Sequence, residues 1–441
     1  MFAKKEENVK NLLVGFAFLF SCAQAAAAEP AVTFYRDVLG ILQQRCQGCH
    51  RPGEIGPMPL RTYSEVRPWA KAIKLAVLTQ KMPPWHADRS VGKFHNDPSL
   101  SPSEIDTLVA WADAGAAEGD PKDAPPPRSF VDGWNIGTPD AVFEMPRSYE
   151  VPTSGTIEYT YVIVPTGFTE DRWVTGTEFR PGNRAIVHHA TVFVREPGSR
   201  WLGKYPVGES FVPAEQIQRA TAPRPAATTN AGAGALDQAI AGYTPGRPER
   251  SLPSGYGMLI PAGSDLVFQL HYTTNGSAAV DRSRVGLVFA KSPPQKRVLR
   301  VTAIDDGFAI PPGAANYPVS GSAVLGVDCE LLSVYPHMHL RGKSMALAVV
   351  YPTGERHELL RVPNYDFSWQ LVYELSEPRM LPTGTTLKAD ATFDNSTSNR
   401  HNPDSKAEAR WGDQSWEEMM AGFFIGAVPA GTDLRGVVAR R

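Results

Sequence analysis

The feature that most constrains the fold of this chain is a change of hydrophobic pattern on either side of a proline-rich segment. The segment runs from Gly119 to Pro127 and contains four prolines, which is typical of a semi-rigid linker. Before it, apolar residues recur at helical spacing. After it, short runs rich in β-branched and aromatic residues alternate with prolines and glycines, which is typical of strands. We therefore expect a helical part followed by an all-β part.

The first part is expected to form a small all-α domain over residues 30–119. Residues 34–44 are predicted as its first helix, and residues 63–78, with apolar residues at near-helical spacing, as its second. The sequence Ser101-Pro102-Ser103-Glu104 predicts the start of a third helix, because it combines a capping box with a proline in the first turn.

The second part is expected to form two jelly-roll-like β-sandwich domains. A length of 441 residues suggests about three domains in all. We place a linker at 120–133 and the β domains at 134–292 and 293–441, with the join near Ser292-Pro293-Pro294. Residues 220–235, rich in Ala, Pro, Thr and Gly, are predicted as a mobile loop. The predicted strands are 157–164, 186–194, 266–273, 285–289, 331–338, 345–350 and 387–393.

The N-terminus has the pattern of an export signal. Lysines at positions 4, 5 and 10 precede an apolar stretch from Leu12 to Phe20, and a run of small residues follows. This predicts a cleaved signal peptide over 1–28 and a periplasmic location; lipid anchoring through Cys22 is disfavoured by the bulky Phe20. No later segment is long and apolar enough to cross a membrane. The net charge of −2 gives no support to a nucleic-acid partner.

A haem-attachment motif follows the first predicted helix. In Cys46-Gln47-Gly48-Cys49-His50, the two thiols would bond the haem vinyl groups and the histidine would bind the iron. The same cysteine spacing occurs in thioredoxin-like pairs and in zinc sites, but the sequence shows neither a βαβ context nor a second thiol pair. We therefore predict one covalent haem c, held by Cys46, Cys49 and His50.

The sixth iron ligand is predicted to be Met82, in Lys81-Met82-Pro83-Pro84-Trp85. A methionine on a proline-stiffened loop between the second and third helices resembles the class I cytochromes c, and the resemblance covers the whole helical part. Methionine ligation raises the iron potential and suits electron transfer. Met58, His86 and His95 are the alternative ligands.

Five of the ten histidines lie in three strand-like segments of the second part. His188 and His189 are adjacent, His271 lies in a second segment, and His337 and His339 are spaced by two, which puts both on one face of a strand. Adjacent residues on a strand point to opposite faces, so His188 and His189 can bind one metal only if the strand bends or ends there. Imidazole ligands admit zinc, copper or nickel, and a thioether partner favours copper.

The second part resembles the copper type II, ascorbate-dependent monooxygenases, the family of peptidylglycine-hydroxylating and dopamine β-monooxygenases. The resemblance runs from Trp134 to the C-terminus and rests on these histidines and on the Glu418-Met419 pair. It implies two coppers with three ligands each: His188, His189 and His271 for the first, and His337, His339 and Met419 for the second, catalytic copper. Met420 is the alternative thioether ligand.

The chain also departs from this family. Animal members are rich in disulfides, whereas this chain has four cysteines, two of them in the haem motif. Tyr335 stands where peptide-amidating members have an arginine that grips the substrate carboxylate, and Phe423 stands where they have a tyrosine. Amidation of a peptide glycine is therefore not expected. The sequence does not identify the substrate, although the more apolar residues suggest a less charged one.

The resemblances together predict an exported copper monooxygenase that hydroxylates a C–H bond of a small organic substrate with O₂. The haem would relay electrons from a quinol pool, another cytochrome or an ascorbate-like reductant to the copper at His188, His189 and His271. A non-catalytic electron-transfer or copper-binding protein that keeps the fold is the first alternative. An oxidase that passes electrons from substrate to haem is the second.

Overall fold

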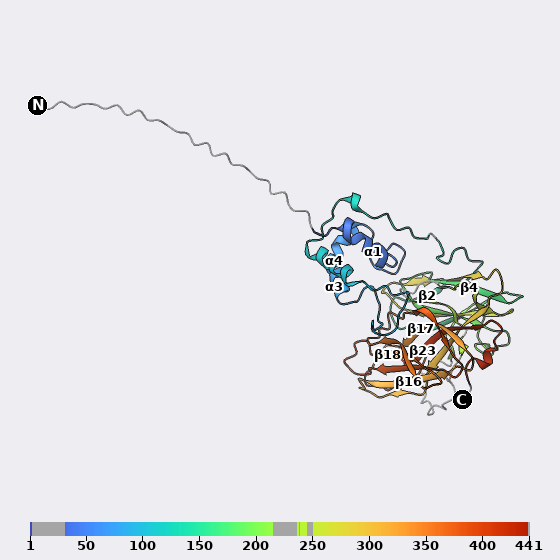
Figure 1. Cartoon of the computed structure of the whole chain (residues 1–441). Coiled ribbons are helices and arrows are strands. Elements are labelled where there is room, and N and C mark those ends of the chain that lie inside the picture. Colours follow the sequence, from blue (N-terminus) through green and yellow to red (C-terminus); the bar gives the residue numbers. More distant parts are fainter. Residues whose placement is uncertain (2–30, 132, 215–235, 238, 245–249, 440–441) are drawn as a thin grey trace.

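The computed structural model describes Met1 and residues 31–131, 133–214, 236–237, 239–244 and 250–439. A smaller helical region lies beside a larger body made of strands (Figure 1). Residues 2–28 of the predicted signal peptide, with Cys22, and the whole predicted loop at 220–235 lie outside the described residues. No helix within the described ranges is long and apolar enough to cross a membrane.

The expectation of a small all-α cytochrome c domain is wrong. Strands make up 37% of the chain and helices 12%, and the helices of the first region are short and separated by irregular segments at 46–62 and 79–101. Prolines such as Pro57 and Pro83 lack an N–H donor and clash with a preceding turn, so the helices cannot continue through these segments. The helical elements are η1 (Phe34–Val38), α1 (Leu39–Arg45), α2 (Tyr63–Val66), η2 (Arg67–Trp69), α3 (Ala70–Leu78), α4 (Pro102–Asp113), η3 (Pro121–Asp123) and η4 (Leu434–Gly436).

The short helices nevertheless share a core and a confirmed cap. Phe34, Leu108 and Trp111 are fully buried in one cluster between η1, α3 and α4. The predicted capping box opens α4: the Glu104 N–H donates to the Ser101 hydroxyl, and the Ser101 N–H donates to the Glu104 carboxylate at 2.6 Å. This contact satisfies two of the free N–H groups of the first turn.

The rest of the chain forms two β-sandwiches, as the sequence pattern predicted. In the first, the sheet β1-β13-β4-β10 packs on the sheet β6-β3-β11-β5-β8 around one apolar core. Its strands are β1 (Ala141–Glu144), β3 (Thr160–Pro165), β4 (Arg172–Arg180), β5 (Val187–Arg195), β6 (Ser210–Phe211), β8 (Ala239–Tyr243), β9 (Arg250–Ser251), β10 (Tyr256–Ile260), β11 (Asp265–Tyr272) and β13 (Arg284–Phe289), with the ribbon of β2 (Tyr149–Val151) and β12 (Ala279–Asp281) beside them.

In the second sandwich, the sheet β14-β23-β17-β20 packs on the sheet β16-β21-β18-β19. Its strands are β7 (Leu236–Asp237), β14 (Lys296–Ile304), β16 (Tyr317–Val324), β17 (Cys329–Met338), β18 (Gly342–Val350), β19 (Arg356–Val362), β20 (Tyr373–Leu381), β21 (Thr386–Phe393) and β23 (Met420–Pro429), with the ribbon of β15 (Ala309–Ile310) and β22 (Ala409–Arg410).

The two sandwiches share one sheet, which the sequence pattern did not predict. Strand β10 of the first pairs in parallel with β14 of the second, where Tyr256 lies opposite Lys296, so ten strands form a continuous sheet. Tyr335 and Ile425 of the second sandwich are buried in the core of the first. The chain passes between them from Phe289, where β13 ends, to Lys296.

The helical region is attached to both sandwiches. Residues 85–96, which we call the strap, lie along β20: the backbone of Phe94 forms an antiparallel bridge with Leu375, and the Asn96 side chain donates to the Val372 carbonyl at 2.8 Å. On the first sandwich, Glu54 pairs with Arg184 at 3.2 Å. These contacts fix the helical region in front of the strands that carry the histidines.

Candidate metal centre

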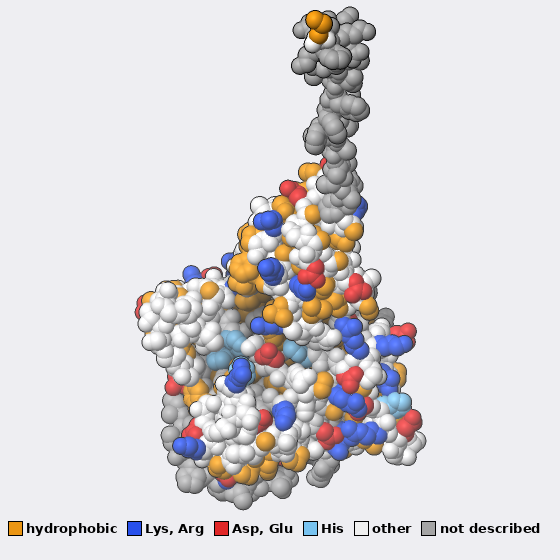
Figure 2. All heavy atoms as spheres, turned by 90° about the vertical axis from the view of Figure 1, so that its left-hand side faces the viewer, with side chains coloured by type: hydrophobic (Ala, Val, Ile, Leu, Met, Phe, Trp, Pro, Cys, Tyr) orange, Lys and Arg blue, Asp and Glu red, His pale blue; other side chains and the backbone are white. Residues whose placement is uncertain are grey.

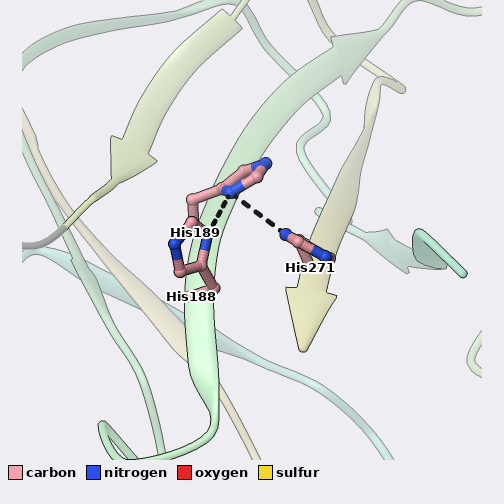
Figure 3. Close-up of side chains that lie close together, drawn as sticks. All are labelled: His188, His189 and His271. Carbon is pink, nitrogen blue, oxygen red and sulfur yellow. Dashed lines mark hydrogen bonds between the residues drawn. The ribbon is translucent and has the colours of Figure 1, made fainter. Parts of the chain in front are cut away.

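Three histidines from two neighbouring strands converge on one point. His188 and His189 lie on β5 and His271 on β11, and one ring nitrogen of each lies within 4.8 Å of the others (Figure 3). His271 pairs with His189 but Tyr272 pairs with Val187, so His188 is an extra residue in β5. Such a β-bulge re-aims a side chain. It explains how two adjacent residues of one strand reach the same site.

The Nδ1 atoms of the three imidazoles lie close together. The Nδ1 atom of His189 lies 3.0 Å from that of His188 and 3.4 Å from that of His271. A neutral imidazole carries a single N–H, so nitrogens that converge in this way favour a cation between them. Burial lowers the pKa of His188 to about 4 and that of His271 to about 3. The three side chains are therefore neutral at pH 7, as metal ligands must be.

Two further side chains orient this three-histidine cluster from behind. The Tyr159 hydroxyl lies 2.6 Å from Nε2 of His189, and its ring stacks on His271 at 4.9 Å. The Ser415 hydroxyl lies 3.3 Å from Nε2 of His271. Contacts of this kind fix the tautomer and ring orientation of a metal-binding histidine.

A second group, the His337–His339 pair, lies at the end of β17. The two ring centroids are 5.2 Å apart, and both residues are buried. Nδ1 of His337 lies 2.7 Å from Oε1 of Gln370, which leaves Nε2 for a ligand. Neither ring nitrogen of His339 has a hydrogen-bond partner among the described residues. A buried imidazole without a partner is costly unless something else binds it.

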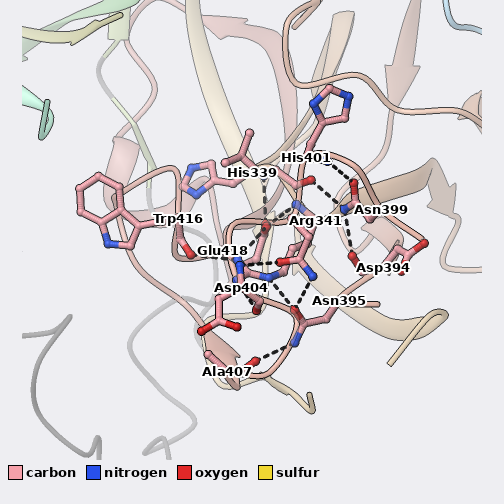
Figure 4. A network of polar contacts seen from close by, with 12 residues as sticks. His339, Arg341, Asp394, Asn395, Asn399, His401, Asp404, Ala407, Trp416 and Glu418 are labelled. Carbon is pink, nitrogen blue, oxygen red and sulfur yellow. Dashed lines mark hydrogen bonds and ion pairs between the residues drawn. The ribbon is translucent and has the colours of Figure 1, made fainter. Parts of the chain in front are cut away.

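A buried polar network holds the backbone around His339 (Figure 4). The Glu418 carboxylate accepts from the N–H of His339 at 3.1 Å and from the N–H of Arg341 at 2.6 Å. The Arg341 guanidinium donates to Oδ1 of Asn395 at 2.8 Å and to the Trp416 carbonyl at 2.8 Å. Glu418 thus ties the turn after β17 to the segment that precedes β23.

The strand register bears on which methionine faces this pair. Met338 lies opposite Met420, and both are fully buried in the core of the second sandwich. His337 lies opposite Ala421, on the other face. Met419 directly precedes β23, and if the alternation of a strand extends to it, its side chain is expected on the face of His337 and His339. The register favours Met419 over Met420 as the thioether ligand.

One aromatic ring contacts both histidine groups. The Phe367 ring stacks on His188 at 5.3 Å and lies 5.9 Å from His339, centroid to centroid. It also contacts His189 and His271 at 6.0 and 6.2 Å. The segment 367–370 therefore touches both groups, since Gln370 bonds to His337.

The haem motif forms a loop with free thiols. Cys46 and Cys49 are unbonded, and burial raises the pKa of the Cys46 thiol to about 12. Nδ1 of His50 donates to the Met58 carbonyl at 3.1 Å, which leaves Nε2 for iron. A Cβ at Gly56 would lie 2.7 Å from that Nδ1, so the loop closes over the histidine only because this residue is glycine. The loop fits the proximal side of a haem site.

Met82 lies in a different setting. It lines a cavity of about 680 Å³ between the helical region and the second sandwich, together with His86 and His339. None of the three attachment residues lines this cavity. Among the alternative ligands, His86 is half-buried in its wall, whereas His95 is paired with Glu374 at 2.7 Å on the surface.

Three residues that shape the site carry no recognisable sequence signal. Tyr159, Phe367 and Gln370 lie in connecting segments, and they become neighbours of the histidines only through the fold. Glu418 was noted as part of the Glu-Met pair, but its contacts with the backbone of His339 and Arg341 could not be read from the sequence.

Comparisons with known proteins assign no family. No family model matches the chain, and no curated protein sequence matches it. Among solved structures, the infectious bursal disease virus Gx strain is similar at 12% identity over 67% of this chain and 72% of that one, with a TM-score of 0.19. The VP2 subviral particle of that virus has a TM-score of 0.18 at 10% identity, over 70% of this chain and 77% of that one. Likeness this weak carries no argument about fold or function.

Proposed function

We propose that this protein is a copper-dependent monooxygenase that inserts one atom of O₂ into a C–H bond of a small organic molecule. The observation that carries the proposal is the presence of two buried groups of neutral imidazoles that both contact Phe367. Three ring nitrogens converge in one group. In the other, neither ring nitrogen of His339 has a hydrogen-bond partner among the described residues, and Met419 directly precedes β23, which pairs with the strand of His337. Imidazole combined with thioether favours copper.

The residues present fit two copper ions. His188, His189 and His271 would hold one, and His337, His339 and Met419 the other. Bound copper would supply one-electron redox chemistry and a site for O₂. The reaction RH + O₂ + 2e⁻ + 2H⁺ → ROH + H₂O needs two electrons and two protons from outside. Burial keeps the imidazoles unprotonated, while Gln370 and Tyr159 orient the rings.

The helical region fits the task of electron delivery. Cys46, Cys49 and His50 would attach one haem c, which cycles between ferric and ferrous states. A quinol, another cytochrome or an ascorbate-like compound is the class of external reductant. Glu54, in the attachment loop, pairs with Arg184, which lies four residues before His188 in the sequence. With the export pattern of the N-terminus, we place this reaction in the periplasm.

Metal content is the first test. We would express the full chain in a periplasm that attaches haem, load it with copper, dialyse it, and measure copper and iron by mass spectrometry. The expected result is two coppers per iron, and incorporation of ¹⁸O from ¹⁸O₂ into a product in a screen of small organic substrates with ascorbate. One copper or none would contradict the proposal and favour a protein that only carries electrons or copper.

A further inference from the structure

We infer that the cavity in front of His339 binds a small, uncharged, partly aromatic molecule, and that the helical region forms one wall of this site. The statement that this molecule is the substrate rests on the proposed function. Binding itself needs only the cavity. Figure 2 shows a hollow between the helical region and the β body, with histidine side chains visible in it.

The cavity is built from both regions of the molecule. On the helical side it is lined mainly by residues 79–83 and 85–89, including Met82, Trp85 and His86. On the sandwich side it is lined by His339, Tyr365 and Phe367, among others. Its volume of about 680 Å³ lies within the range of about 300–1,000 Å³ of small-molecule sites. The β body alone therefore provides half of the site.

The charges of the lining favour an uncharged occupant. Its charged side chains are Lys81, Asp88, Arg89 and Asp366, two of each sign. Asp88 also lies 3.6 Å from Arg361. A net charge on the ligand would meet no excess of opposite charge here, yet would lose its hydration. The rings of Trp85, Tyr365 and Phe367 provide flat apolar surface for an aromatic group.

The cavity wall also contains two histidines, His86 and His339. Nε2 of His86 is buried without a hydrogen-bond partner among the described residues, as are both ring nitrogens of His339. A neutral imidazole can donate or accept, depending on its tautomer. These nitrogens are shielded from the cavity, so the apolar rings and the balanced charges of the lining, rather than the imidazoles, favour the class of ligand.

The haem is the competing occupant of this space, because Met82 lines it. The attachment residues Cys46, Cys49 and His50 do not line the cavity, which places the space outside the attachment loop. The test therefore uses protein with haem attached, so that a haem filling the cavity would prevent binding.

Three probes of equal size separate the charge classes: benzamide, benzoate and benzylammonium, titrated by calorimetry into the haem-containing full chain with and without copper. We expect benzamide to bind at least tenfold more tightly than either ion. Ser368→Trp, at the cavity rim, should weaken benzamide at least tenfold. Ser277→Trp is the matched control and should leave binding unchanged. Both serines are exposed, and each donates its N–H to the side chain two residues earlier, Asn275 for Ser277 and Asp366 for Ser368.

Two results would overturn the inference: equal binding of the three probes, or benzamide binding that Ser368→Trp leaves intact. Absence of benzamide binding in the unsubstituted protein would overturn it as well. The copper content of the same samples is measured in parallel. Loss of copper with intact benzamide binding would contradict the proposed function and leave the cavity assignment standing.

Discussion

The two histidine groups differ in how completely the protein surrounds them. The three-histidine cluster draws its ligands from paired strands of one sheet, and its rings contact Tyr159 and Ser415 from behind. For the His337–His339 pair, the proposed third ligand, Met419, comes from the segment before β23, and His339 lies in the wall of a cavity. A site enclosed by its own sheet suits a metal that only exchanges electrons, whereas a site that meets a cavity suits a metal that must meet other molecules.

Removing one ligand from each group tests most directly whether the two groups bind copper separately. His271→Ala and His339→Ala should each reduce the copper content from two per chain to one, and each should lower turnover on the order of 1,000-fold, since both electrons are needed. Copper analysis and product assays measure this. If one substitution removed both coppers, the groups would form a single coupled site.

Acid should destabilise the metal-free protein through both groups, and His188 and His337 allow one residue of each group to be compared. Burial lowers the pKa of His188 and of His337 to about 4 from 6.5. In the unfolded chain these imidazoles bind protons near pH 6.5, but in the folded chain only near pH 4. Their contribution to the free energy of unfolding is therefore complete above pH 6.5 and is lost as the pH falls toward 4. Each imidazole contributes about 3 kcal/mol over that window.

Urea unfolding of the copper-free protein at several pH values would show this slope. His188→Asn and His337→Asn should each reduce the slope by about one proton. An unchanged slope in either variant would mean that its imidazole is already protonated in the folded chain.

Removing an orienting contact should weaken one site and spare the other. Tyr159→Phe should lower copper affinity at the three-histidine cluster, and Gln370→Leu at the His337–His339 pair, each by about 10–100-fold. Competition with a copper chelator would measure both affinities. A loss at both sites from one substitution would show that the groups are not independent.

The smallest expected effects come from substitution of the two neighbouring methionines, Met419 and Met420. Met420→Leu should cost less than about 1.5 kcal/mol of stability and leave copper binding unchanged, because Met420 is core. Met419→Leu should lower the affinity for Cu(I) about tenfold with little change in stability. The reverse result would assign the ligand to Met420.

Much of the β part could be predicted from the sequence. Its strands show alternating or continuous apolar residues, and prolines and glycines separate them. Seven predicted strands correspond to observed ones within a few residues, such as 186–194 with Val187–Arg195. The histidine spacing indicated that His188 and His189 need a distorted strand, and the bulge at His188 provides it. These inferences succeed because they depend on local periodicity.

The failures depend on long-range contacts. The all-α domain was inferred from a motif and three helical patterns, yet prolines interrupt the helices and the strap pairs with β20. The shared sheet depends on two residue pairs between β10 and β14. Gln370 and Phe367 lie in a loop with no pattern of its own, so their place beside the histidines follows only from the packing of the two sandwiches.

The strap has a consequence for solubility. Strand β20 is the last strand of its sheet, and an uncovered edge presents free N–H and C=O groups on which another chain can add a strand. The bridge at Phe94 and the Asn96 contacts occupy part of that edge. A β body cut away from the helical region would therefore be prone to aggregate, and the region that faces the histidines also acts as a built-in guard against self-association.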